Sequence, residues 1–147
     1  MSAAKLFSEI FDEFKKAIID QERILILRKY DHRRFRDFLA IAFNSTFQFD
    51  VSIPQYKPAR EPAGLNNTYL DVEVPKLYRF IIGHPKRVTD IKPDRQTKLL
   101  QGVLESLHKD EAELLCNLIR KDLKIDFLTA KLVKEAFPDI NIQLENE

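Results

Sequence analysis

The sequence predicts a single, mostly helical (all-α) domain of about six to seven helices, because apolar side chains recur at three- and four-residue steps along most of the chain. Its 147 residues match the usual size of one domain and allow a core that needs no disulfides. The composition, 44% hydrophobic and 32% charged, is typical of a globular protein. We therefore expect one domain over residues 1–147, with a Pro-rich loop in its middle.

The first third of the chain predicts three helices, over residues 3–19, 21–29 and about 32–43. Asp31 stands directly before the third of them and is the expected N-cap. The apolar residues expected on the faces of these helices are Phe7, Ile10, Phe11, Phe14, Ile18, Ile24, Leu25, Leu27, Phe35, Phe38, Leu39 and Ala42.

Residues 44–67 break the helical pattern with three prolines and Gly64. Phe47, Phe49, Val51 and Ile53 alternate with polar residues, which predicts a partly extended strap lying along the helices. A functional loop is the alternative, because a long irregular segment inside a compact domain often carries function.

The second half of the chain predicts four more helices. The fourth contains or begins at Pro75 and ends at Gly83, and the loop 84–93 separates it from a fifth helix over 94–107. Asp110 and Glu113 have the spacing of a capping box for the sixth helix. A short seventh helix is expected between Thr129, as N-cap, and Pro138, and the acidic tail 141–147 is expected to fray.

Charge is balanced overall but not along the chain. The formal net charge is +1, yet residues 1–100 hold 18 basic and 13 acidic side chains, whereas residues 101–147 hold 6 and 10. This polarity leaves room for a local basic face. Cys116 is the only cysteine, no apolar run reaches the ~18–20 residues of a membrane span, and the N-terminus lacks signal-peptide features. We expect an intracellular protein that binds no membrane.

The sequence contains no recognisable catalytic or cofactor motif. Its three histidines lack metal-ligand spacing with one another or with Cys116, and its three glycines form no phosphate-binding loop. No serine stands in a nucleophile elbow, and the carboxylates are explained by capping and surface charge. We expect a non-enzymatic protein without a cofactor or metal.

Two basic clusters are candidates for phosphate contact. The first comprises Arg28, Lys29, Arg33, Arg34 and Arg36, and the second comprises Lys86, Arg87, Lys92, Arg95 and Lys98. A solvated helix face explains the first cluster equally well, because Asp31 and Asp37 dilute its charge.

Two resemblances add to this reading. Residues 112–140, with Leu118–Ile119–Arg120, Asp122–Leu123–Lys124–Ile125 and Lys131 through Pro138, resemble the helical N-terminal DNA-binding domain of ATP-dependent DNA ligases. That resemblance implies DNA contact by Lys121, Lys124, Lys131 and Lys134. Asp126 stands where those ligases usually have glycine, and their lysine-x-Asp-Gly signature is absent, so no ligase activity is expected.

The whole chain also resembles small uncharacterised proteins of T4-like tailed phages. The shared pieces are Leu27–Asp31, Tyr56–Pro58, Leu107–Leu115 and Leu128–Pro138. This second resemblance implies a phage protein in the host cell cytoplasm.

Three functions stay open on the sequence. The leading hypothesis is a DNA-binding accessory factor in phage DNA metabolism, with the DNA backbone as its partner. The alternatives are an adaptor that binds a host or phage protein, and a structural virion component. The residues expected to contact DNA are Lys121, Lys124, Lys131, Lys134, Arg33, Arg34, Arg36, Lys86 and Arg87.

Overall fold

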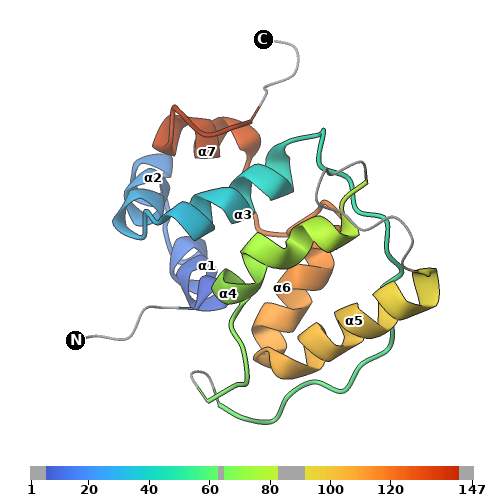
Figure 1. Ribbon diagram of the computed structural model, residues 1–147. Helices are drawn as coiled ribbons and strands as arrows, with labels where there is room; N and C mark the ends of the chain where they lie inside the picture. Colours follow the sequence, from blue (N-terminus) through green and yellow to red (C-terminus); the bar gives the residue numbers. More distant parts are fainter. Residues whose placement is uncertain (1–5, 63–64, 83–91, 143–147) are drawn as a thin grey trace.

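The computed structural model describes residues 6–62, 65–82 and 92–142, and within them the protein is all-α (Figure 1). Its helices are α1 (Phe7–Lys15), α2 (Asp20–Lys29), α3 (Arg33–Phe43), α4 (Leu70–Glu73), the 3-10 helix η1 (Val74–Phe80), α5 (Pro93–Ser106), α6 (Lys109–Ile119) and α7 (Ala130–Ala136). No strand forms in the described part of the chain, where extended segments meet in an isolated bridge between Phe49 and Ile81. The predicted all-α class is confirmed.

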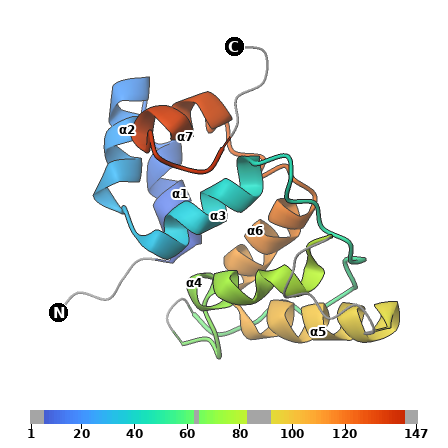
Figure 2. The same ribbon diagram turned by 45° about the horizontal axis from the view of Figure 1, so that its top comes forward.

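Helix α6 lies between two groups of helices (Figures 1 and 2). On one side it contacts α1, and the short C-terminal α7 returns to pack against α2 near the start of the chain. On the other side α6 contacts α4 and α5, while α3 packs against α4 and η1. Segments far apart in the sequence therefore share one core.

Four phenylalanines form the centre of the contact between α1 and α3. Phe7 and Phe11 each pack against both Phe35 and Phe38, with ring centroids 5.3 to 6.0 Å apart. All four side chains are at most 4% exposed. Such tilted and edge-on aromatic pairs add about 0.5–1.5 kcal/mol each beyond the area that they bury.

Helix α1 ends earlier than the apolar pattern predicts, at Lys15 instead of residue 19. Arg23 stabilises the turn that follows α1, because its Nη2 donates to the carbonyls of Ala17 (3.3 Å) and Ile18 (3.0 Å). Ile18, expected on the buried face of the first helix, lies in this turn and is 81% exposed.

Two predicted N-caps are wrong by a few residues. His32, not Asp31, caps α3, since its Nδ1 accepts the backbone N–H of Arg34 at 3.2 Å. His108 caps α6 in the same way, accepting from Asp110 at 3.1 Å, so the capping box expected at Asp110 does not form. Thr129 is the N-cap of α7, as predicted.

The predicted fourth helix is two short pieces, α4 and η1, that meet between Glu73 and Val74, directly before Pro75. Proline lacks an amide donor and its ring clashes with the carbonyl four residues earlier, so the α-helical hydrogen-bond pattern cannot continue through it. The sequence predicts that this helix ends at Gly83, whereas η1 already ends at Phe80, and Ile81 forms the isolated bridge with Phe49. Gly83 itself lies outside the described residues.

The strap predicted within residues 44–67 packs as expected. Residues 44–62 form no helix. The strap residues partly buried against the core are Phe49, Val51, Ile53 and Tyr56. The backbone N–H of Lys57 donates to the Glu105 carboxylate (3.0 Å), which ties the strap to α5.

Candidate nucleic-acid interface

The first turn of α3 is the most cationic helix start in the described structure. Arg33 and Arg34 are exposed, and neither guanidinium has a partner among the described residues. Arg36 pairs with Asp31 at 2.8 Å and lies over the Phe137 ring at 5.9 Å. No acidic residue stands in this turn. The free N–H groups and positive dipole end of a helix already favour an anion, so two unpaired guanidinium groups there make a site suited to phosphate.

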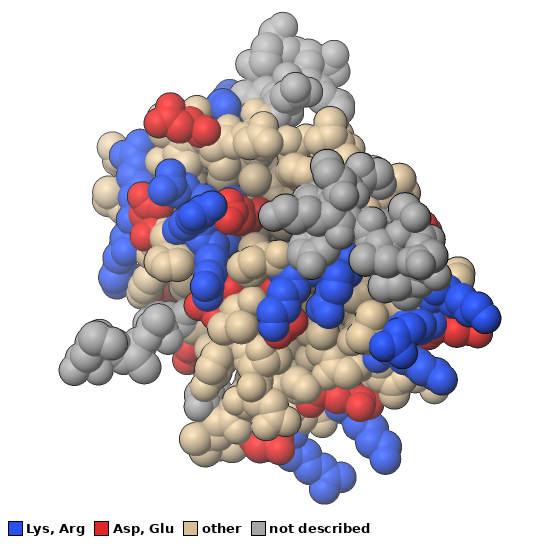
Figure 3. All heavy atoms as spheres, viewed as in Figure 1, with Lys and Arg blue, Asp and Glu red and all other residues tan. Residues whose placement is uncertain are grey.

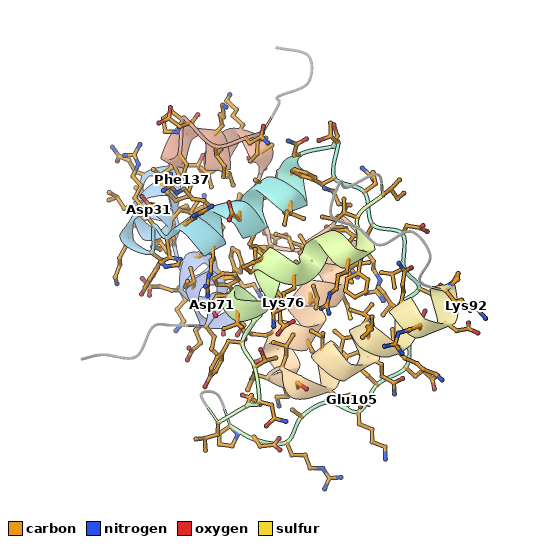
Figure 4. The ribbon with its side chains drawn as sticks, in the orientation of Figure 1. Asp31, Asp71, Lys76, Lys92, Glu105 and Phe137 are labelled. Atoms are coloured by element: carbon orange, nitrogen blue, oxygen red, sulfur yellow. The ribbon has the colours of Figure 1, made fainter. Side chains whose placement is uncertain are left out.

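Further cations lie on the same side of the molecule, which we call the front face. Figure 3 shows Lys and Arg gathered over α2 and the start of α3, over η1 and over α5 in a single view. Figure 4 places Lys76 on η1 and Lys92 at the start of α5. The described cations of η1 and α5 are Lys76, Arg79, Lys92, Arg95 and Lys98.

The front face is not purely basic. Lys76 and Arg79 lie 3.9 and 3.8 Å from the buried carboxylate of Glu73, which neutralises part of their charge. Figure 3 also shows Asp and Glu side chains between the basic groups, and Figure 4 labels Asp31, Asp71 and Glu105 among them. The side chains of Arg33, Arg34, Lys92, Arg95 and Lys98 have no ion-pair partner among the described residues.

Two of the residues predicted to contact DNA have amines that are bound to backbone carbonyls. The amine of Lys121 donates to the backbone carbonyls of Ile41 and Asn44 (2.9 Å for Asn44) at the C-terminal end of α3. The amine of Lys134 donates to the Ile140 carbonyl at 3.0 Å. Arg28 of the first basic cluster likewise binds the carbonyls of Glu135 and Ala136 at the end of α7. These cations satisfy backbone acceptors that the helix ends leave open.

Burial lowers the pKa of Lys121 to about 8, because removal from water penalises its charged form. Lys121 also has a positive φ of 61°, a conformation that side chains with a Cβ rarely adopt. Both features indicate an amine held in place by the fold.

The other predicted residues divide among separate places. Lys131 is exposed on α7, and Lys124 lies in the turn between α6 and α7, where it lines hollows together with residues of α1 and α2. Lys86 and Arg87 lie outside the described residues. The structure thus brings Arg33, Arg34 and Arg36 to the front face, and it does not place Lys121, Lys124 and Lys134 in one surface cluster with them.

The interior holds titratable groups whose burial changes their chemistry. Glu111 is 1% exposed, and burial raises its pKa to about 7 against the opposing effect of two backbone N–H donors, those of Phe7 and Leu70. Burial also raises the pKa of the Cys116 thiol, which lies 4.0 Å from the Tyr56 hydroxyl. A raised pKa keeps a thiol protonated and weakly nucleophilic. Among the described residues no group of three His, Cys, Asp or Glu side chains is placed to hold a metal ion.

The buried positions of Arg23 and Glu111 are indicated by a pattern in the sequence. Arg23 and Leu27 are four residues apart, as are Glu111 and Leu115, so each charged residue continues an apolar stripe into the core. A charged residue on an apolar stripe indicates a buried, hydrogen-bonded group. Lys76 and Arg79 have no such signal, because only the fold brings η1 between α3 and α5.

The fold and this surface define a small all-α protein with a mixed, locally cationic front face. No helix in the described part is long and apolar enough to cross a bilayer. A family model described as "Family of unknown function (DUF6433)" matches residues 10–125, and the chain belongs to that family. A search of curated proteins gives no match.

Proposed function

We propose that this protein is a non-enzymatic DNA-binding accessory factor that holds backbone phosphates on its front face. The observation that carries the proposal is the pair of unpaired guanidinium groups, Arg33 and Arg34, in the first turn of α3. Phosphate contacts from such cations give affinity with little sequence preference, because every nucleotide carries the same phosphate.

The revised interface differs from the one that the sequence predicts. Arg33 and Arg34 stay in it, and the exposed cations of α5 join them. Lys121 and Lys134 leave it, because their amines are bound to backbone carbonyls. The resemblance to proteins of tailed phages supports DNA metabolism in the cytoplasm of an infected host as the setting.

The adaptor alternative receives less support from the Pro-rich strap, the segment that could present an extended strip to a partner. It requires a free apolar strip along the Pro-rich strap, yet Phe49, Val51, Ile53 and Tyr56 pack against the core. Leu65 is the exposed large apolar residue described in this region.

A binding experiment with two charge-reversal variants tests the proposal. Labelled duplex DNA is titrated with wild type, with Arg33→Glu/Arg34→Glu, and with Arg60→Glu/Lys109→Glu, a control of equal charge change on the strap and α6. We expect micromolar or tighter binding by wild type at about 50 mM salt, and a loss of at least tenfold in affinity for the α3 variant only. Equal losses of affinity in both variants would show that only the net charge of the protein matters, and they would contradict the proposed interface.

A further inference from the structure

Phe127 is displayed on the surface by an unusual turn. It is 63% exposed and has a positive φ of 68°, and Lys121 and Lys124 in the same turn also have positive φ values, of 61° and 57°. This left-handed conformation is sterically unfavourable for residues other than glycine, and for a bulky aromatic it is a clear outlier. Such backbone strain persists where the surrounding structure enforces it, and it is concentrated at functional sites.

Arg23 holds the Phe127 ring from one side. Its guanidinium carbon lies 3.9 Å from the ring centroid, which is a close cation–π contact. The guanidinium is itself fixed by hydrogen bonds to Asp20 (2.6 Å) and to the carbonyls of Ala17 and Ile18, and Arg23 is only 6% exposed. Phe127 nevertheless stays 63% exposed, so part of its surface is open to solvent.

The ring borders a hollow that carries unpaired positive charge. The hollow measures about 230 Å³ and is lined by Phe14, Lys15, Arg23, Lys124, Asp126 and Phe127. Lys15 and Lys124 are exposed, and their amines have no partner among the residues that the structure describes. Arg23 is neutralised by Asp20, so two free amines stand against the single carboxylate of Asp126.

We propose that this hollow binds one nucleotide unit, with the base stacked on the exposed Phe127 ring and its phosphate held by Lys15 and Lys124. A fixed aromatic ring beside cations is the combination by which proteins bind single-stranded nucleic acid, because stacking accepts any base and the cations bind the backbone. The ligand chemistry, an aromatic base joined to a phosphate, is shared by single-stranded nucleic acid and free nucleotides.

The site goes beyond the proposed function, because its residues belong to α1, α2 and the turn before α7, not to α3, η1 or α5. Exposed Ile18 and Ile19 lie in the link between α1 and α2, and they would suit an apolar protein segment instead. The two free amines beside the ring favour a phosphate-bearing ligand, and contact with another protein is an outcome of the test below.

The chain contains no tryptophan, so the variant Phe127→Trp places the chain's single tryptophan at the site, as a fluorescent reporter. Its emission is followed during titration with an eight-nucleotide single-stranded DNA and, separately, with AMP. The titrations are repeated with two further variants of the Phe127→Trp protein. One also carries Lys15→Glu/Lys124→Glu, and the other carries the control pair Arg60→Glu/Lys109→Glu. Anisotropy of the labelled oligonucleotide with wild type and Phe127→Leu checks the result without the tryptophan.

We expect saturable quenching that weakens at least tenfold with Lys15→Glu/Lys124→Glu and not with the control pair, and weaker oligonucleotide binding by Phe127→Leu. Quenching by the oligonucleotide alone assigns the site to single strands, and equal quenching by AMP assigns it to free nucleotides. No quenching, or quenching indifferent to the two lysines, overturns the proposal. A shift of the tryptophan emission to the blue when the protein is concentrated without ligand would mean that contact with another protein molecule covers the ring. That result also overturns the proposal. Arg33→Glu/Arg34→Glu, introduced into the Phe127→Trp protein, should leave the quenching unchanged. The proposal for this site is therefore tested separately from the proposal for the front face.

Discussion

At the scale of single residues, Glu111 joins three helices through one buried carboxylate. Its oxygens accept the backbone N–H of Phe7 at 3.1 Å, at the start of α1, and that of Leu70 at 3.0 Å, at the start of α4. A carboxylate at a helix N-terminus satisfies an amide that has no helical partner, and here one side chain from α6 does so twice.

The raised pKa of Glu111 predicts that stability falls as pH rises. In the unfolded chain the carboxyl group has its usual pKa near 4.5, whereas burial raises the pKa to about 7 in the folded protein, with the charges of Asp71 and Glu9 acting in the same direction. The folded state therefore binds the proton more tightly, and this contribution is fully present below about pH 4.5 and lost as pH rises through 7. The shift corresponds to about 3 kcal/mol at most.

Urea unfolding of wild type and Glu111→Gln between pH 5 and 8 measures this effect, because glutamine does not titrate. We expect the stability of Glu111→Gln to stay nearly constant with pH, since its neutral amide resembles the protonated carboxyl group, and the stability of wild type to fall relative to it as pH rises. A stability difference between the two proteins that stays constant, or that shifts in favour of wild type toward pH 8, contradicts the assignment.

Lys121 offers a test of structural against DNA-binding roles for one residue. Lys121→Met keeps the length of the side chain but removes the donor to the Ile41 and Asn44 carbonyls. We expect a loss of about 1–3 kcal/mol in the free energy of unfolding, because two backbone acceptors become unsatisfied. DNA affinity of the folded variant should change less than twofold, and Lys131→Met is the exposed control that should leave stability unchanged. A large loss of affinity without a loss of stability would return Lys121 to the interface.

At the scale of elements, the first turn of α3 places charge where it opposes helix stability. Arg33 and Arg34 stand at the positive end of the helix dipole, without an acidic residue in the same turn. Arg33→Glu/Arg34→Glu should therefore stabilise the protein by about 0.3–1 kcal/mol for each residue while weakening DNA binding. Thermal unfolding at low salt measures the first effect. A lower melting temperature for this variant would mean that the two arginines make stabilising contacts, and it would undercut their assignment to a ligand.

Regular apolar spacing predicts the helices themselves well, but it does not predict their ends. The stripe of α1 continues through Ile18 in the sequence, whereas α1 stops at Lys15 and Arg23, from the next helix, binds carbonyls of the turn that follows. The caps at His32 and His108 likewise depend on contacts that apolar spacing does not show. Asp31 and Asp110 have the stronger intrinsic preference for a cap, but the histidine nitrogens occupy the required position.

At the scale of the whole molecule, linear charge clusters predict part of the candidate interface. Arg33 and Arg34 are visible in the sequence as a run of basic residues, and both are free in the structure. The run 121–134 also carries four lysines, yet Lys121 and Lys134 bind carbonyls that come from the end of α3 and from the segment after α7. Sequence spacing within one helix cannot show that acceptors from another part of the chain lie within reach of its lysines.

The two surfaces with unpaired charge carry two separate proposals. The front face has exposed cations of α3 and α5, and the hollow beside Phe127 has one aromatic ring with two amines. The two surfaces lie on different elements, so charge reversal at one of them should leave the other unchanged. This independence allows each proposal to be tested in the folded protein.

The salt dependence of DNA binding tests the central claim, that free cations on the front face hold phosphates, most directly. The logarithm of the affinity for duplex DNA is measured against the logarithm of salt concentration for wild type and for Arg33→Glu/Arg34→Glu. Each phosphate contact contributes a slope of about −0.9, so we predict a steep decline for wild type and a slope shallower by about two units for the variant. Identical slopes for the two proteins, or no binding by wild type at about 50 mM salt, would contradict the account.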